Sequence, residues 1–188
     1  MSASEEMRGG TSLGKAAGVV WALTLAALGA CVLLTWEELP GRVAYTFGAE
    51  GASSEYARAD FLRFCAFIGA LYNGVLLLAR VSIGVVPVRL WDMFCGIPQT
   101  WMSYWMSTPQ RMAILSGRLK AYLCCVGAAA NAAFLLLYYM IYAANVPGAP
   151  GALRLESVAT AYTLPMVCAV FSLPAGIALL WLMRPPRA

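Results

Sequence analysis

The sequence contains no histidine, and only 12% of its 188 residues are charged. A soluble domain of this length carries about twice that charged fraction, so the composition argues against a water-soluble fold. None of the six cysteines forms a C-x-x-C pair. Without histidine and without such a pair, a zinc or haem site built from His and Cys ligands is nearly excluded. We therefore expect no metal and no cofactor.

Hydrophobic residues make up 61% of the chain, and the mean hydropathy is +0.71. They fall in long runs, and a helix needs roughly 20 apolar residues to cross the hydrocarbon. The runs do not alternate as barrel strands would, and unpaired backbone groups are costly in lipid. The sequence thus predicts an all-α membrane protein with a tail at 1–15 and a single four-helix membrane domain at 16–188. The predicted spans are 16–36, 62–84, 121–145 and 158–182.

Lysine and arginine are concentrated in the segments that this arrangement places on one side of the membrane. Nine lie on the side of the two termini and of the loop 85–120: Arg8, Lys15, Arg80, Arg89, Arg111, Arg118, Lys120, Arg184 and Arg187. Four lie on the other side: Arg42, Arg58, Arg63 and Arg154. Because basic residues are enriched in cytoplasmic segments, both termini are predicted to be cytoplasmic. The loop 37–61 then faces outward.

Another interpretation of the N-terminus starts from Leu28-Gly29-Ala30-Cys31, which resembles a bacterial lipoprotein signal with a lipidated cysteine. The apolar run continues past Cys31, and Glu5 and Glu6 suit a signal peptide poorly. A membrane span is therefore favoured, and lipidation of Cys31 stays open.

Two amides sit midway along predicted spans, Asn73 in the second and Asn131 in the third. An amide facing lipid costs free energy, so both are predicted to point inward and to support helix packing. A stripe of small residues on the first span predicts close helix approach there; it consists of Gly18, Ala22, Ala26 and Ala30.

The loop 85–120 is rich in aromatic residues and methionine, and prolines at 87, 98 and 109 divide it into short pieces. This composition is typical of a segment in the headgroup layer, where its basic residues would meet anionic lipid. A docking face for a cytoplasmic partner is the alternative. The candidate residues are Trp91, Trp101, Tyr104, Trp105 and Arg111.

The loop 37–61 combines a Leu-Pro pair, aliphatic and aromatic residues, and glycines that allow tight turns. Its candidate recognition residues are Leu39, Pro40, Val43, Tyr45, Phe47, Gly51 and Tyr56. From Leu39 onward the loop resembles a bacterial membrane domain of unknown function found at the N-terminus of SdpI-type immunity proteins. That signature runs Leu-Pro-x-x-Val-Pro-x-His-Phe, followed by a glycine and an aromatic residue. This chain departs from it at Ala44 and Thr46, where the family has proline and histidine.

The resemblance implies a multi-pass protein of the bacterial inner membrane. It also implies recognition, immunity or signalling through the outer loop, with a peptide or envelope ligand. The loop as a mere connector, an accessory subunit of a larger membrane complex, and a small-solute transporter are the alternatives. Transport fits less well because no charged residue lies deep in a span. We expect no enzymatic activity, since the candidate carboxylates lie at span rims without a nucleophile motif. The expected partners are the lipid bilayer and a second membrane protein, and no nucleic acid.

Overall fold

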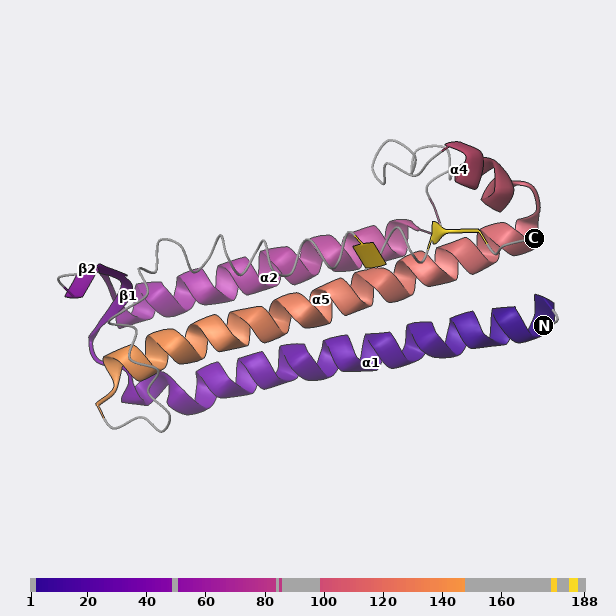
Figure 1. The fold of residues 1–188 in the computed structure, drawn as a ribbon. Helices are drawn as coiled ribbons and strands as arrows, with labels where there is room; N and C mark the ends of the chain where they lie inside the picture. The colour runs from indigo at the N-terminus through magenta and orange to yellow at the C-terminus, as the bar shows by residue number, and fades with distance from the viewer. Residues whose placement is uncertain are drawn as a thin grey trace. The chain divides into compact units, whose positions relative to one another are not determined.

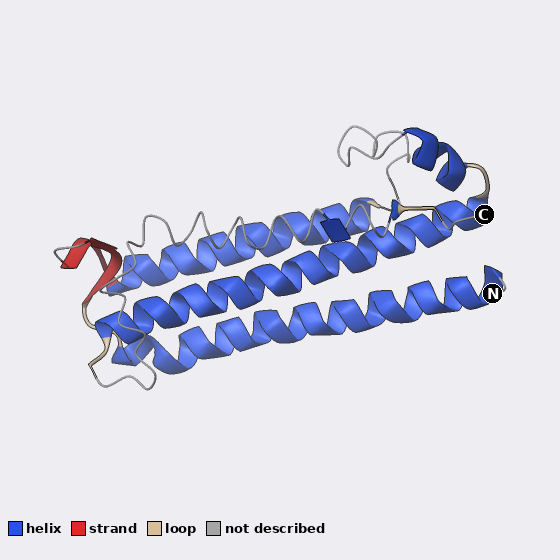
Figure 2. Ribbon diagram, viewed as in Figure 1, coloured by secondary structure: helices blue, strands red, loops and turns tan. Residues whose placement is uncertain are grey.

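The computed structural model describes residues 3–48, 51–83, 85, 99–147, 177–178 and 183–185. It is mostly helical (Figures 1 and 2), with α1 over Ala3–Thr35, α2 over Arg58–Ser82, α4 over Gln99–Met106 and α5 over Pro109–Asn145. A short 3-10 helix, Trp36–Glu38, follows α1. Two strands precede α2, namely β1 over Arg42–Gly48 and β2 over Gly51–Ala57.

Three helical segments in the described residues are long and apolar enough to cross a membrane: Gly14–Glu38, Arg58–Ser82 and Pro109–Asn145. They match the first three predicted spans and indicate a membrane protein. The fourth predicted span, 158–182, lies outside the described residues except for 177–178, which are helical.

The start of α5 corrects the predicted boundary between the loop 85–120 and the third span. The helix begins at Pro109, although the sequence predicted a span from 121. Proline is well suited to the first helical position because its missing N–H would be unpaired there anyway. The Thr108 hydroxyl accepts a hydrogen bond from the Arg111 backbone N–H at 3.3 Å and so caps the helix. Residues 109–120 are therefore helix and not loop.

The segment predicted as the outer loop contains an antiparallel two-stranded sheet (Figure 2). Arg42 pairs with Ala57 at the open end, and Gly48 pairs with Gly51 at the turn end. The register is irregular between Ala44 and Phe47. Gly48 and Gly51, two glycines expected to permit tight turns, form the last residue pair between the strands, and residues 49–50 lie outside the described part.

The chain divides into two compact units, and each of the three long helices contributes one stretch to each. Unit 1 comprises Met1–Ala22, Asn73–Ala128 and Leu173–Ala188, and unit 2 comprises Leu23–Tyr72 and Ala129–Ser172. The basic and acidic residues are distributed unequally between them. Unit 1 has nine basic and three acidic residues, whereas unit 2 has four and six.

Helix packing within unit 1 centres on the indole of Trp21. Its Nε1 donates a hydrogen bond to Asn73 Oδ1 at 2.7 Å. Gly127 of α5 lies against the same ring, since a Cβ there would come within 2.5 Å of Trp21 Nε1. Ala17, Ala121, Cys124 and Ala128 complete this buried cluster. Asn73 is thus buried, as predicted, with an aromatic N–H as a partner.

The small-residue stripe on α1 does not pack as predicted. Ala22, Ala26 and Ala30 are exposed, whereas Ala17 and Trp21 are buried. The first unit therefore uses an adjacent face of α1, which places the large indole against Gly127. On α5 the small residues Ala128 and Ala133 are buried, and so is Asn131, at 0% exposure.

The core of unit 2 lies between the hairpin, the start of α2 and the end of α5. Its buried side chains are Leu39, Val43, Phe61, Tyr138, Tyr142 and Ala143. Phe61 of α2 stacks on Tyr138 of α5, with ring centroids 6.4 Å apart. Further along the same helices, Tyr72 meets Phe134 edge to face at 5.8 Å.

Candidate functional site

The candidate site is the segment 36–57, which we call the hairpin cap. A network of hydrogen bonds holds the chain where α1 ends and the cap begins. Thr35 Oγ1 donates to the Cys31 carbonyl at 2.8 Å and lies 2.8 Å from the Tyr138 hydroxyl. Because the single Thr35 hydroxyl hydrogen is used on Cys31, Tyr138 donates to Thr35. The Tyr142 hydroxyl donates to Glu38 Oε2, so two tyrosines one helical turn apart on α5 hold the exit of α1.

Arg58, the first residue of α2, closes the base of the cap. Its Nη1 donates to the Glu37 and Leu39 carbonyls at 3.2 and 3.1 Å. Its backbone N–H donates to the Gly41 carbonyl at 2.9 Å. The guanidinium also lies 5.2 Å from the centroid of the Trp36 ring, a cation–π distance. One arginine thus ties the backbone after α1 to the start of α2.

Two of the predicted recognition residues form the floor of the cap and not its surface. Leu39 is 2% exposed and Val43 0% exposed, and both pack in the unit 2 core. Pro40 between them is exposed. Leu39 and Val43 are therefore unavailable to a ligand, and their role is to anchor the hairpin.

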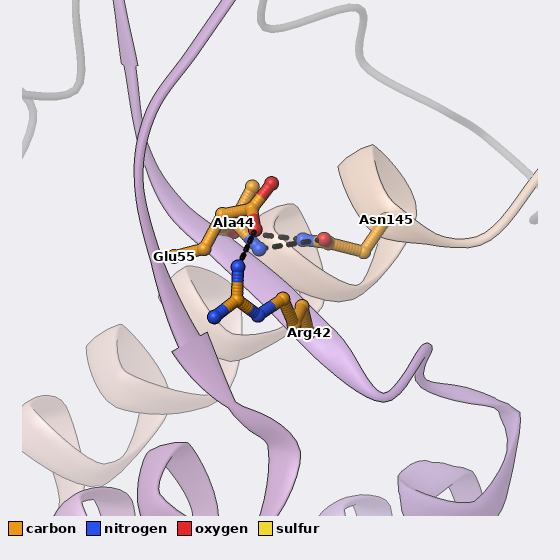
Figure 3. Close-up of polar contacts among 4 residues, drawn as sticks. All are labelled: Arg42, Ala44, Glu55 and Asn145. Carbon is orange, nitrogen blue, oxygen red and sulfur yellow. Dashed lines mark hydrogen bonds and ion pairs between the residues drawn. The ribbon is translucent and has the colours of Figure 1, made fainter.

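Asn145, the last residue of α5, holds β1 from the side away from β2 (Figure 3). Its Oδ1 accepts from the Ala44 N–H and its Nδ2 donates to the Ala44 carbonyl, both at 2.8 Å. The Nδ2 also donates to the Ile141 carbonyl at 2.8 Å. A side-chain amide has one acceptor and one donor group, so it pairs with both backbone groups of Ala44 as a neighbouring strand residue would.

The bond to Asn145 depends on the residue at position 44. A proline there would have no N–H to donate and could not make the bond to Asn145 Oδ1, whereas alanine retains that donor. Thr46, two residues on, belongs to β1 and pairs with Ser54, but its side chain lies outside what the structure describes.

Three rings lie in a row, Tyr45 and Tyr56 of the cap and Phe64 of α2, and we call them the aromatic face. Tyr45 and Tyr56 stack at 4.4 Å with an interplanar angle of 10°, and Phe64 of α2 lies 6.3 Å from Tyr56. Tyr56 is 39% and Phe64 53% exposed. The hydrogen bond to Tyr45 raises the pKa of Tyr56 above its usual value, so Tyr56 is neutral at physiological pH.

The charges around the aromatic face are exposed. Arg42 Nη1 lies 3.9 Å from Glu55 Oε2 (Figure 3), and such surface pairs stabilise a fold little. Of the remaining predicted loop residues, Phe47 and Gly51 are paired strand residues whose side chains are not described. Tyr45 and Tyr56 are therefore the predicted residues that the structure brings together at the surface.

Sequence reasoning missed Arg58, Asn145 and the pair Tyr138 and Tyr142 as parts of this site. A signal was present on α5, because positions 138, 142 and 145 follow i, i+4 and i+7 spacing and share one helix face. These polar and aromatic residues at the end of a span resembled an ordinary interfacial belt. Only the hairpin that they contact distinguishes them from such a belt.

The predicted residues of the loop 85–120 lie in unit 1, away from the cap in sequence. Trp101, Tyr104 and Trp105 belong to α4, and Arg111 belongs to the first turn of α5. Trp91 lies outside the described residues. Within the described part of the chain, no three His, Cys, Asp or Glu side chains are grouped to hold a metal ion.

The cap combines an anchored floor with an upper surface that carries aromatic rings and charges. Its floor is anchored at Leu39, Val43 and Ala44, and its upper surface presents aromatic rings beside exposed charges. Comparisons of this chain with protein-family models, with curated proteins and with solved structures find no match.

Proposed function

We propose that this chain is a recognition protein of the bacterial inner membrane, related to the SdpI-type domains that its Leu-Pro segment resembles. In this proposal it has four spans and both termini in the cytoplasm. The unequal charges support the orientation, since unit 1 carries the excess of basic residues that is typical of cytoplasmic segments. The hairpin cap of unit 2 then faces outward.

The observation that carries the proposal is the anchoring of the cap combined with its exposed aromatic face. A connector between two spans needs neither a buried floor nor a side-chain amide that replaces a strand partner. The bonds of Asn145 and Arg58 instead fix the hairpin, and a rigid surface loses less conformational entropy on binding. Exposed tyrosine rings are frequent anchors of protein interfaces.

The charge of the cap region indicates the class of ligand. Between residues 37 and 61 there are five acidic and two basic residues, and this negative excess favours a positively charged partner by complementarity. Tyrosine and phenylalanine rings provide apolar contact area and cation–π acceptors. A cationic, partly apolar peptide at the outer face combines both properties, and the function would be protection or signalling in response to it.

The test is a growth assay with cells that lack the gene and carry a plasmid copy. Cells are challenged with spent medium of the same strain, and the plasmid encodes the wild type or the double variant Tyr45→Ala/Tyr56→Ala. We expect the wild type to restore growth and the double variant to lose most of that effect at equal membrane abundance. Arg63→Ala is the matched control, because Arg63 is exposed and pairs with its neighbour Asp60.

A replacement of residues 41–58 by a Gly/Ser linker of equal length separates recognition from simple connection. If cells carrying this linker grow as well as the wild type, the segment is a connector and the proposal fails. If growth is lost with the linker and with the double variant but is kept with Arg63→Ala, the recognition proposal is supported.

The second candidate function is that of an accessory subunit, and the exposed small residues of α1 favour it. Ala22, Ala26 and Ala30 leave a narrow strip uncovered, and such strips allow close approach of another membrane helix. Native gel electrophoresis of gently solubilised membranes distinguishes the two. A stable larger complex that is lost on Ala26→Leu, with growth unaffected by the cap variants, would favour the subunit.

A further inference from the structure

The corner between α4 and α5, residues 99–118, is separate from the cap in sequence and has its own buried core. We call it the α4–α5 corner. Trp105 is 1% exposed, and its Nε1 donates to the Met183 carbonyl at 2.8 Å. Met102 and Trp105 pack with Ile83, Ile114, Leu115, Leu119 and Met183. The short helix α4 is therefore fixed against α5.

Two arginines of α5 lie on neighbouring aromatic rings of α4. Tyr104 and Trp105 meet edge to face at 5.1 Å. The Arg111 guanidinium lies 4.0 Å from the Tyr104 ring centroid, and that of Arg118 lies 5.0 Å from the Trp105 centroid. Seven residues correspond to two helical turns, so both arginines project from the same face of α5.

Arg111 is held in a geometry that leaves part of its guanidinium available. Its Nη1 donates to Ser107 Oγ at 2.6 Å and, more weakly, to the Tyr104 carbonyl at 3.5 Å. Both bonds use the same nitrogen, so within the described residues Nε and Nη2 keep donors for another acceptor. A planar guanidinium with two such donors matches the oxygens of a phosphate group.

The surroundings of the corner supply little negative charge. No Asp or Glu occurs between Asp92 and Glu156, a stretch that contains all of α4 and α5. The same stretch contains Arg111, Arg118, Lys120 and Arg154. Unit 1 as a whole has six more basic than acidic residues. An anion from outside the chain would therefore be attracted to the corner.

We propose that the α4–α5 corner binds the phosphate of an anionic phospholipid, with Arg111 as the main contact and Arg118 as the second. The length of α5 explains the choice of a lipid. Its 37 residues extend about 55 Å, whereas the hydrocarbon layer measures about 30 Å. The first turns of α5 thus lie at headgroup level, where aromatic and basic side chains meet lipid phosphates. The inference does not depend on the function of the cap.

The experiment measures lipid bound to the full-length protein, delipidated in a neutral detergent. Phosphatidylglycerol or phosphatidylcholine is added in mixed micelles, and the retained lipid is quantified by native mass spectrometry. We expect phosphatidylglycerol to be retained in preference to phosphatidylcholine. Arg111→Gln should weaken its binding about tenfold, the loss expected for charge-assisted hydrogen bonds. Arg111→Lys should recover part of it, because it keeps the charge but not the planar fork.

Arg63→Gln is the control, since it removes an exposed arginine of unit 2, and it should leave phosphatidylglycerol binding unchanged. Circular dichroism and thermal unfolding confirm that each variant is folded, and Arg118→Gln provides a second variant with an expected smaller loss. Equal retention of the two lipids, or equal loss with Arg63→Gln and Arg111→Gln, would overturn the proposal. Tight binding of inorganic phosphate that phosphatidylglycerol does not displace would also overturn it, because the ligand would then be free phosphate.

Discussion

At the scale of single residues, three side chains hold parts of the chain that are far apart in sequence. Asn145 binds Ala44 across 101 positions, Trp21 binds Asn73 across 52, and Arg58 binds the Leu39 carbonyl across 19. Each satisfies polar groups that would be costly to leave unpaired near the apolar interior. These contacts, more than the exposed ion pairs, fix the cap and the helix packing.

The bonds between Asn145 and Ala44 lead to a prediction for the stability of the cap. Asn145→Leu removes both bonds, and Ala44→Pro removes the donor on β1. Each change should destabilise the cap by about 1–3 kcal/mol and should speed hydrogen–deuterium exchange in 42–57. If the two residues act through the same contact, the double variant should cost less than the sum of the singles. Full additivity would show that Asn145 stabilises the protein in some other way.

At the scale of elements, the packing of the helices depends on where a large side chain meets a small one. The indole of Trp21 lies against Gly127 and is held there by its bond to Asn73. The apolar runs predicted three of the helices, but they did not reveal which face of α1 is buried. The start of α5 likewise depended on the helix N-cap at Thr108, which a count of apolar residues does not detect.

The contact of Trp21 with Gly127 predicts an unequal effect of adding one methyl group at two glycines. Gly127→Ala should destabilise the detergent-solubilised protein by about 1–3 kcal/mol through overpacking, because the indole cannot move without losing its bond to Asn73. Gly74→Ala is the control, since a Cβ there meets nothing within 4 Å. It should be neutral or slightly stabilising through helix propensity. Thermal unfolding compares the two, and equal midpoints would contradict the close contact.

At the scale of the whole molecule, the distribution of charge carries the proposed orientation. The positive excess of unit 1 and the negative excess of unit 2 follow the bias of cytoplasmic and external segments. With four spans, the C-terminus would lie on the same side of the membrane as the N-terminus. With three spans, the two termini would lie on opposite sides.

Cysteine labelling in intact cells tests this orientation. In a background with all six cysteines replaced, Ser53→Cys should react with an impermeant maleimide in intact cells. Ser107→Cys should react only after the cells are lysed. A cysteine added after Ala188 should behave like Ser107→Cys if there are four spans. If that added cysteine is labelled in intact cells, the protein has three spans and not four. If Ser107→Cys is labelled in intact cells and Ser53→Cys is not, the proposed orientation is wrong.

The sequence by itself determined the membrane character and the approximate position of three spans, because the length and hydropathy of an apolar run are local properties. It also indicated that Asn73 and Asn131 would be buried, since an amide in lipid lacks partners. Only the tertiary structure decided that the segment after α1 is a hairpin with Leu39 and Val43 as its floor. Its β1 strand is completed by the side chain of Asn145, and that contact depends on which faces of distant elements meet. No local pattern around Ala44 specifies it.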